Sequence, residues 1–329
     1  MRTLKRVLLV AGAALLAVLV YRTGAEPIVA TLGQLTWWQF ALVCLPYGLT
    51  TVVDTLGWRF AFRADTVPFP RLAGARLAGE ALNLVTAVGQ VGGEAAKAWL
   101  VRRDVPYAES VPSIVIAKTT ITIAQALFLA LGIGAAWTLS TGGPALIETM
   151  AWLLLVEVLA VGGFLAAQVT GVVGRAGRLV VATGLARDAG HARALDRALR
   201  DYYRRDWRRF ALSVGFHLLG WIFSAVEALA AAWALGIPIS LVGALTVEAL
   251  GSAVRFASFL VPASLGAYEG GNAAAFAALG HGAAAGLAFS FVRRARQVVW
   301  IVIGLLVLAG MRWADARHRA RASRPPSMG

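Results

Sequence analysis

The most informative segment of the chain is Ser258-Phe-Leu-Val-Pro-Ala-Ser-Leu-Gly-Ala-Tyr-Glu-Gly-Gly-Asn272. Strongly apolar segments lie on both sides of it, yet it contains Pro262, Gly266 and the carboxylate of Glu269. A segment that only had to cross a bilayer would not place helix breakers and an acid there. An earlier stretch, Val88-Gly-Gln-Val-Gly-Gly-Glu94, has the same character. The fold and the function depend on what these two interrupted, polar segments do.

The composition around these stretches is typical of a membrane protein. Of the 329 residues, 59% are hydrophobic and only 15% are charged, with a mean hydropathy of +0.70. Several windows of about 20 residues, the length that crosses the hydrocarbon core, carry almost no charge. The predicted fold class is an all-α polytopic integral membrane protein. One integral domain is expected over residues 1–311, in halves 1–140 and 141–311, followed by a basic cytoplasmic tail at 312–329.

The distribution of charge predicts the orientation in the membrane. The formal net charge is +14, but the Lys and Arg residues fall at alternate segment ends. The opposite set of connections lacks both residue types: Thr23–Thr36, Ser140–Ile147 and Gly236–Ser240. This is the positive-inside asymmetry. It predicts a multi-pass protein of a bacterial-type cytoplasmic (inner) membrane, with both termini in the cytoplasm, and it argues against a nucleic-acid partner.

The hydropathy and the charge pattern together predict six full spans and two re-entrant helical hairpins. The spans are expected at Leu4–Arg22, Trp37–Phe62, Pro112–Leu139, Glu148–Thr170, Phe210–Leu235 and Ala283–Met311. The hairpins are expected at Ala75–Val101, which is flanked by basic residues, and at Leu241–Gly280, which is flanked by uncharged connections. The two hairpins occupy corresponding places in the two halves. The arrangement indicates an inverted repeat, which transporters use to place a site near the bilayer midplane.

Many charged and polar residues fall inside the predicted spans and hairpins. Each intramembrane charge costs roughly 2.5–3.5 kcal/mol on insertion scales unless it is paired or hydrated. The set therefore predicts a polar cavity, although private structural ion pairs would also explain it. The candidate substrate-binding residues are Glu80, Asn83, Gln90, Glu94, Lys97, Lys118, Glu248, Arg255, Pro262, Gly266, Glu269, Arg293 and Arg294.

The helix breaks near Gly92 and Gly266 suggest anion binding. The N-terminus of a half-helix presents unpaired N–H groups and the positive end of the helix dipole. A phosphate or carboxylate headgroup would suit a cavity with such ends and with nearby Lys and Arg. Arg293, Arg294 and Arg296 follow one another too closely to be expected all to face the interior. Arg293 is the preferred candidate among them.

A second basic element is expected on the cytoplasmic side, in the connection before the fifth span. Residues 192–210 place Leu195, Leu199, Tyr202 and Tyr203 near one helical face, with arginines around them. This pattern predicts an amphipathic interfacial helix whose segment Arg193–Arg209 binds anionic headgroups. Positive-inside charge without any ligand would explain it equally well.

Signatures of enzymes are missing from the sequence. The four histidines form no metal-ligand spacing, and there is no phosphate-binding loop of the Walker type. The single Cys44 excludes an intramolecular disulfide. The chain is expected to be no enzyme and to use neither a metal nor a cofactor.

Three runs of residues carry a resemblance to a known family. They are Gly-Gln-Val-Gly-Gly-Glu-Ala-Ala-Lys at 89–97, Leu-Val-Pro-Ala-Ser-Leu-Gly-Ala-Tyr-Glu-Gly-Gly at 260–271 and Ser-Phe-Val-Arg-Arg-Ala-Arg at 290–296. They resemble the flippase-like family that includes the membrane half of lysylphosphatidylglycerol synthase. The last two runs look most like the hopanoid-biosynthesis-associated membrane proteins. The resemblance implies lipid flipping or transport, without the aminoacyl-transfer domain of the synthase.

The sequence therefore predicts a lipid flippase or transporter. Its cargo would be an amphiphile, anionic or of isoprenoid or hopanoid type, whose headgroup crosses through the polar cavity while its tails stay among the membrane lipids. An ion- or proton-coupled transporter of small solutes would use the same architecture. A non-catalytic scaffold of a lipid-synthesis complex is a further alternative.

Overall fold

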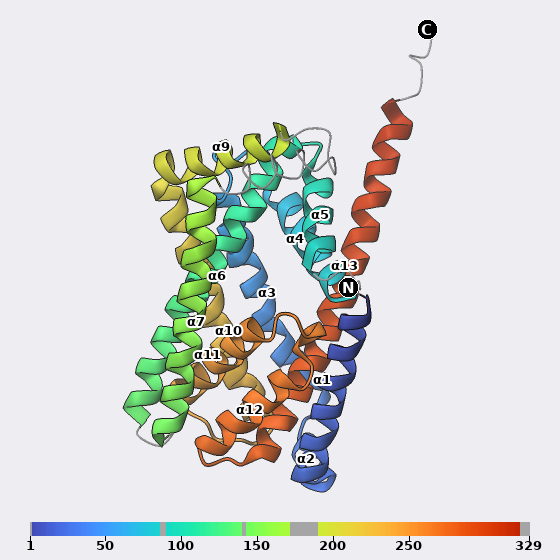
Figure 1. Ribbon diagram of the computed structural model, residues 1–329. Helices are drawn as coiled ribbons and strands as arrows, with labels where there is room; N and C mark the ends of the chain where they lie inside the picture. The colour runs from blue at the N-terminus through green and yellow to red at the C-terminus, as the bar shows by residue number, and fades with distance from the viewer. Residues whose placement is uncertain (1, 86–89, 140–142, 172–189, 323–329) are drawn as a thin grey trace.

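The computed structural model describes residues 2–85, 90–139, 143–171 and 190–322. Within these ranges the chain forms twelve α-helices and one short 3-10 turn, with no strand (Figure 1). The predicted all-α membrane class is confirmed, because six of the helices are long and apolar enough to cross a bilayer.

The six long helices match the six predicted spans. They are α1 (Arg2–Thr23), α3 (Trp37–Phe60), α6 (Tyr107–Leu139), α7 (Gly143–Thr170), α10 (Trp207–Ala234) and α13 (Ala283–Ala322). The last helix differs most from expectation, because it continues eleven residues past Met311, through most of the expected basic tail. A short helix, α2 (Ala25–Leu32), occupies part of the connection after the first span.

Two pairs of short helices lie where the re-entrant hairpins were expected. The first pair is α4 (Phe69–Val85) and α5 (Gln90–Val101), and the second is α11 (Leu241–Ala257) and α12 (Ala267–Ala278). Each pair combines 17 residues with 12 residues, and each helix is shorter than the roughly 20 residues of a full span. Figure 1 shows the first pair in the upper half of the molecule and the second in the lower half.

The packing of the two pairs follows one scheme. Helix α4 packs on α13, the last span of the second half, and α11 packs on α6, the last span of the first half. Helices α3 and α10, which precede the two pairs, pack against each other. This exchange of partners is what an inverted repeat would produce, although re-entrance and the repeat remain predictions.

The interrupted stretch quoted first separates α11 from α12. Its centre is the 3-10 turn η1 (Pro262–Ser264), where Ala263 and Ser264 have φ angles of 54° and 51°. Side chains disfavour this left-handed region, so packing must hold the turn in place. Helix α1 supplies part of that packing, because a Cβ atom at Gly12 would lie 2.6 Å from the carbonyl oxygen of Leu265.

Helix α9 (Gly190–Arg205) is the predicted amphipathic element and lies across one end of the bundle (Figure 1). It ends earlier than expected, because α10 begins at Trp207 after a break at Asp206. The predicted apolar face is confirmed. Leu199 and Tyr202 are buried, and the Tyr202 hydroxyl donates a hydrogen bond of 2.7 Å to the carbonyl of Phe60.

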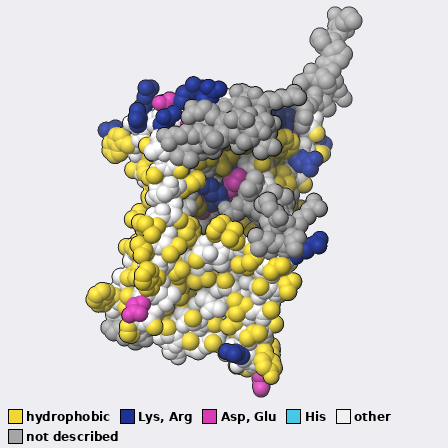
Figure 2. All heavy atoms as spheres, in the orientation of Figure 1, with side chains coloured by type: hydrophobic (Ala, Val, Ile, Leu, Met, Phe, Trp, Pro, Cys, Tyr) yellow, Lys and Arg dark blue, Asp and Glu magenta, His cyan; other side chains and the backbone are white. Residues whose placement is uncertain are grey.

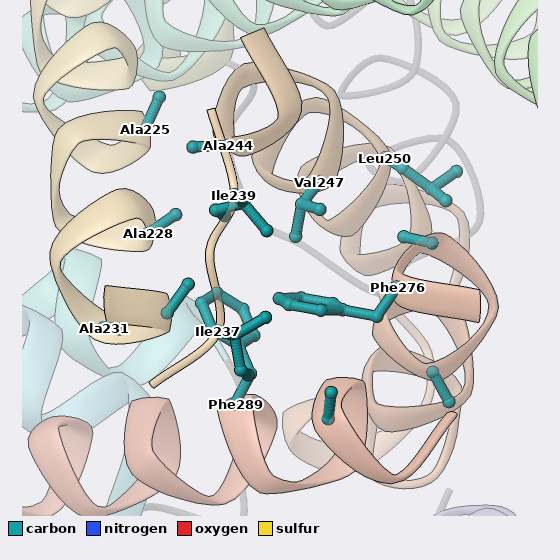
Figure 3. Packing of buried hydrophobic residues seen from close by; sticks show 14 of the residues in the cluster. Ala225, Ala228, Ala231, Ile237, Ile239, Ala244, Val247, Leu250, Phe276 and Phe289 are labelled. Atoms are coloured by element: carbon teal, nitrogen blue, oxygen red, sulfur yellow. The ribbon is translucent and has the colours of Figure 1, made fainter. Parts of the chain in front are cut away.

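The larger apolar core fills the opposite end, between α10, α11, α12 and α13. Figure 3 shows Phe276 and Phe289 meeting Ile237 and Val247 there. Helix α10 contributes small residues, including Ala228, which allow close approach of its neighbours. This packed end fixes the height at which the charged residues of α10, α11 and α13 lie.

Candidate functional site

A buried charge cluster joins α10, α11 and α13, and Arg293 is at its centre. The Arg293 guanidinium lies 3.0 Å from a carboxylate oxygen of Glu227 and 2.9 Å from both oxygens of Glu248. Arg296 makes a second ion pair with Glu227 at 3.0 Å. Glu248 also accepts a hydrogen bond from Ser224 at 2.7 Å and pairs with Arg255 at 3.2 Å. Such pairs hold the three helices in one register.

The start of α12 forms a second, smaller cluster. The Glu269 carboxylate accepts a hydrogen bond of 2.7 Å from the backbone N–H of Gly266 and pairs with Arg294 at 2.8 Å. The Arg294 and Arg255 guanidinium groups both lie over the ring of Tyr268, at 5.4 and 4.6 Å from its centroid. The helix N-terminus that was expected to bind an external anion is therefore capped by its own acidic residue.

A third cluster lies between α3, α4 and α10. Arg76 pairs with Asp54 at 2.7 Å and with Glu80 at 2.8 Å. Asp54 also lies 3.0 Å from Nδ1 of His217. The Tyr47 hydroxyl donates a hydrogen bond of 3.2 Å to Glu80. Burial of Arg76 and Asp54 makes the pairing obligatory, because an unpaired charge at this depth would be costly.

A fourth cluster surrounds Glu94 on α5. Its carboxylate pairs with Lys118 of α6 at 2.9 Å and with Lys97 at 3.3 Å, and it accepts a hydrogen bond from Asn83 of α4 at 3.2 Å. The Asn83 oxygen in turn accepts the backbone N–H of Gly93 at 2.8 Å. A Cβ atom at Gly93 would lie 2.0 Å from the carbonyl oxygen of Gly79, so the glycine permits the close contact of the two helices.

Tyr47 connects two of the clusters. The Arg296 guanidinium lies 4.4 Å from the centroid of the Tyr47 ring, whose hydroxyl contacts Glu80. Arg296, Tyr47 and Glu80 line a cavity of about 20 Å³, which is roughly the room that one water molecule needs. The charged residues of the two halves thus form a continuous polar layer inside the bundle.

The edge of this layer is cationic and accessible. The side chains of Lys118, Arg255 and Arg294 are 39%, 34% and 24% exposed, whereas those of Glu248 and Glu269 are each 1% exposed. Figure 2 shows basic and acidic side chains inside a recess in the upper half of one face, with hydrophobic side chains below it and to its left. A group that enters the recess from outside therefore contacts the basic side chains before their acidic partners.

Two of these cations, Lys118 and Arg255, lie at similar positions along the long direction of the bundle. The side chain of Gln125 on α6 donates a hydrogen bond of 3.0 Å to the carbonyl of Ser252 on α11. Arg255 lies one turn beyond Ser252, and Lys118 lies two turns before Gln125 on the antiparallel α6. Lys118 is therefore positioned just beyond the end of α11.

Apart from Pro262, every predicted site residue whose contacts the structure describes contributes a side chain or, at Gly266, a backbone N–H to one of the four clusters. Glu80, Asn83, Glu94, Lys97, Lys118, Glu248, Arg255, Glu269, Arg293 and Arg294 all take part in the clusters. Pro262 and Gly266 belong to the turn between α11 and α12. The Gln90 side chain and Gly89 lie outside the described residues.

One expectation about the last span was wrong. Arg293, Arg294 and Arg296 were not expected all to face the interior, yet each makes an ion pair with a buried glutamate. Arg293 and Arg296 share a face because they are three residues apart, and the long side chain of Arg294 reaches Glu269 on α12.

Several site residues were missed by the sequence reasoning. Arg76 and His217 were assigned no role, and Arg296 and Tyr47 were not among the candidates. Arg76 precedes Glu80 by one helical turn, a spacing that favours an ion pair. Tyr47 carries no such signal, because its partners are distant in sequence.

Potential metal ligands do not gather in the described part of the chain, where no group of three or more His, Cys, Asp or Glu residues could hold an ion. At the end that carries α9, Asp65 accepts a hydrogen bond of 2.6 Å from Arg209 and pairs with Arg59 at 3.0 Å. These contacts, the hydrogen bond foremost, lower the pKa of the Asp65 carboxyl. Together with Arg63–Asp206 at 3.0 Å, they fasten the start of α10 to the end of α3.

Comparison with known proteins gives one match. No curated protein and no solved structure matches the chain. The sequence model of one family, described as the lysylphosphatidylglycerol synthase TM region, matches residues 5–323. The match includes α4, α5, α11 and α12 and every charged cluster described above. The chain therefore belongs to the family of the lysylphosphatidylglycerol synthase transmembrane region, whose members are membrane proteins related to lipid handling.

Proposed function

We propose that this protein is a lipid flippase that moves an anionic amphiphile between the two leaflets. The observation that carries the proposal is the accessible cationic edge of the intramembrane layer, formed by Lys118, Arg255 and Arg294. Their acidic partners lie deeper, so the recess offers positive charge to an incoming headgroup.

The charge balance of the layer supports an anionic cargo. The four clusters contain seven Lys and Arg residues against six Asp and Glu residues, which leaves one net positive charge with His217 neutral. In a region of low dielectric constant, one uncompensated charge strongly favours a counter-ion. A phosphate is a suitable one, because Arg and Lys bind its oxygens by charge-assisted hydrogen bonds.

The shape of the recess suits an amphiphile better than a small solute. The recess opens on the side of the bundle, and the surface below it and to its left in Figure 2 is largely hydrophobic. A headgroup could enter the polar layer from the side while its acyl or isoprenoid tails stayed in the bilayer. No covalent step on the lipid is part of this proposal.

The proposed orientation places α9 at the cytoplasmic face of an inner membrane. Arg193, Arg197, Arg204 and Arg205 are exposed along this helix, and Trp207, which follows it, is 63% exposed. Basic residues beside an exposed tryptophan suit the headgroup region of an anionic leaflet. We propose that this segment anchors the bundle to anionic lipids.

The test is lipid movement in proteoliposomes that contain a trace of fluorescent phosphatidylglycerol or phosphatidylcholine. A membrane-impermeant quencher reports the fraction of probe in the outer leaflet. We expect the protein to accelerate exchange of the anionic probe more than that of the zwitterionic probe. Lys118→Ala and Arg255→Ala should slow it, whereas Arg22→Ala, at an exposed arginine at the end of α1 and outside the recess, should not. Equal rates in wild-type and protein-free vesicles would refute the proposal.

A further inference from the structure

Glu157 is a buried carboxyl group that none of the four clusters includes. It lies in the middle of α7, where its sequence neighbours Val156 and Val158 are each 50% exposed. Glu157 itself is 0% exposed, and neither carboxylate oxygen has a hydrogen-bond partner. The side chain therefore points away from the lipid, into the contact between α7 and the bundle.

The surroundings of Glu157 contain charged groups that bind other partners. Helix α7 packs against α6, α9, α11 and α12. Lys118, Arg255 and Glu269 have Glu94, Glu248 and Arg294 as partners, and Tyr203 donates to Gln168. Among the described side chains of these four helices, the titratable and charged groups are Tyr107, Glu109, Lys118, Glu248, Arg255, Tyr268, Glu269, Arg193, Asp196, Arg197, Arg200, Asp201, Tyr202, Tyr203, Arg204 and Arg205. In the described residues none of them forms an ion pair with Glu157.

A carboxylate in this position would be costly when ionised. The penalty for burying an unpaired ion amounts to several kcal/mol even after relaxation, and a carboxyl group avoids it by keeping its proton. By contrast, the six acidic residues of the clusters each have a basic partner. The described arrangement is thus the one in which Glu157 is neutral.

Register places Glu157 at the height of the recess. A Cβ atom at Gly132 on α6 would lie 3.3 Å from the Met150 side chain on α7, and Thr119 on α6 is hydrogen-bonded to Gln168 on α7. Between these contacts of two antiparallel helices, Glu157 lies level with Leu127, about two and a half turns from Lys118. Figures 1 and 2 show α6 and α7 along one side of the recess.

We infer that Glu157 is a proton-binding site coupled to the anionic headgroup, so that one proton accompanies each lipid. The inference rests on the proposed function. With a headgroup in the recess, the extra positive charge has its counter-ion and Glu157 stays protonated. When the headgroup leaves, the contact around α7 opens to water, Glu157 releases its proton, and its carboxylate replaces the lost negative charge. The transported pair, one anion and one proton, is electrically neutral.

The coupling is tested by imposing a pH difference across proteoliposomes. For the wild type, acidifying one side should accelerate movement of fluorescent phosphatidylglycerol away from that side. Glu157→Gln imitates the neutral acid and should abolish this dependence while the protein stays folded. A wild-type rate that ignores the pH difference, or an equal dependence in Glu157→Gln, would overturn the inference.

Two further measurements separate this inference from the proposed function. Infrared difference spectra on changing the pH should show a protonated carboxyl band in the wild type that is lost in Glu157→Gln. Glu157→Gln should also unfold at the same temperature as the wild type at neutral pH, whereas the matched change Glu227→Gln should unfold earlier because it weakens ion pairs with Arg293 and Arg296. If the carboxyl band and the unfolding temperatures match these expectations but no lipid moves, Glu157 is still a proton-binding site and the flippase proposal is refuted. If the band persists in Glu157→Gln, the inference falls.

Discussion

Replacement of Arg293 by alanine probes the centre of the charged layer. The Arg293 side chain is 3% exposed and contacts Glu227 at 3.0 Å and Glu248 at 2.9 Å. Its removal leaves two buried carboxylates with fewer partners, since Glu227 keeps Arg296 and Glu248 keeps Arg255. Removing one partner of a buried ion pair lowers the free energy of unfolding by about 3–5 kcal/mol, mostly because the other charge stays buried without a counter-charge.

The assay is thermal unfolding of purified variants in detergent, followed by the fraction that remains monodisperse. We expect Arg293→Ala to unfold well below the wild type. Neutralising a partner that Arg293 leaves behind, as in Arg293→Ala with Glu248→Gln, should recover part of the loss, because Glu248 is buried whereas its other partner, Arg255, is 34% exposed and can be hydrated. Arg208→Ala, at an exposed arginine, is the control and should stay within about 1 kcal/mol of the wild type. An Arg293→Ala protein as stable as the control would refute the idea that these buried pairs hold α10, α11 and α13 together.

Three other changes test the packing and the end that carries α9. Gly57→Ala should destabilise the protein, because the added methyl group would lie 2.6 Å from the ring of His217; thermal unfolding measures the loss, and unchanged stability would contradict the close packing. Gly12→Val should likewise loosen α1 from the turn at η1, seen as faster proteolysis near that turn than in the wild type. The Asp65–Arg209 contact lowers the pKa of Asp65 below its usual 3.8, so its stabilisation is present above that pH and is lost as the pH falls through the lowered pKa. Asp65→Asn should therefore reduce the fall in the free energy of unfolding on acidification. The difference should be less than about 1 kcal/mol, because the site is partly exposed.

Much of the fold could be predicted because a bilayer imposes few solutions. Apolar length identified the six spans, and the interrupted stretches around Gly266 and Gly92 marked the short helices between them. The ends were less predictable. The last helix continues to Ala322 because basic residues favour a helical C-terminus as much as a solvated tail, and Asp206 divides α9 from α10 where the amphipathic pattern ran on.

The members of the candidate site could be listed from the sequence, but not their pairing. Intramembrane charges identify themselves by their cost, which is why Glu94, Glu248 and Arg293 were found. Which carboxylate meets which base depends on packing across distant helices. Glu269, for example, pairs with Arg294 and caps its own helix, where an external anion had been expected.

Binding of an anionic headgroup in the recess at Lys118, Arg255 and Arg294 can be observed directly. The most direct measurement is an electron cryomicroscopy map of the protein in nanodiscs that contain phosphatidylglycerol. We expect phosphate density within hydrogen-bond distance of Lys118 or Arg255, with tails leaving the recess sideways, and no such density in the Lys118→Ala, Arg255→Ala double variant. A wild-type recess occupied only by acyl chains or water would contradict this expectation.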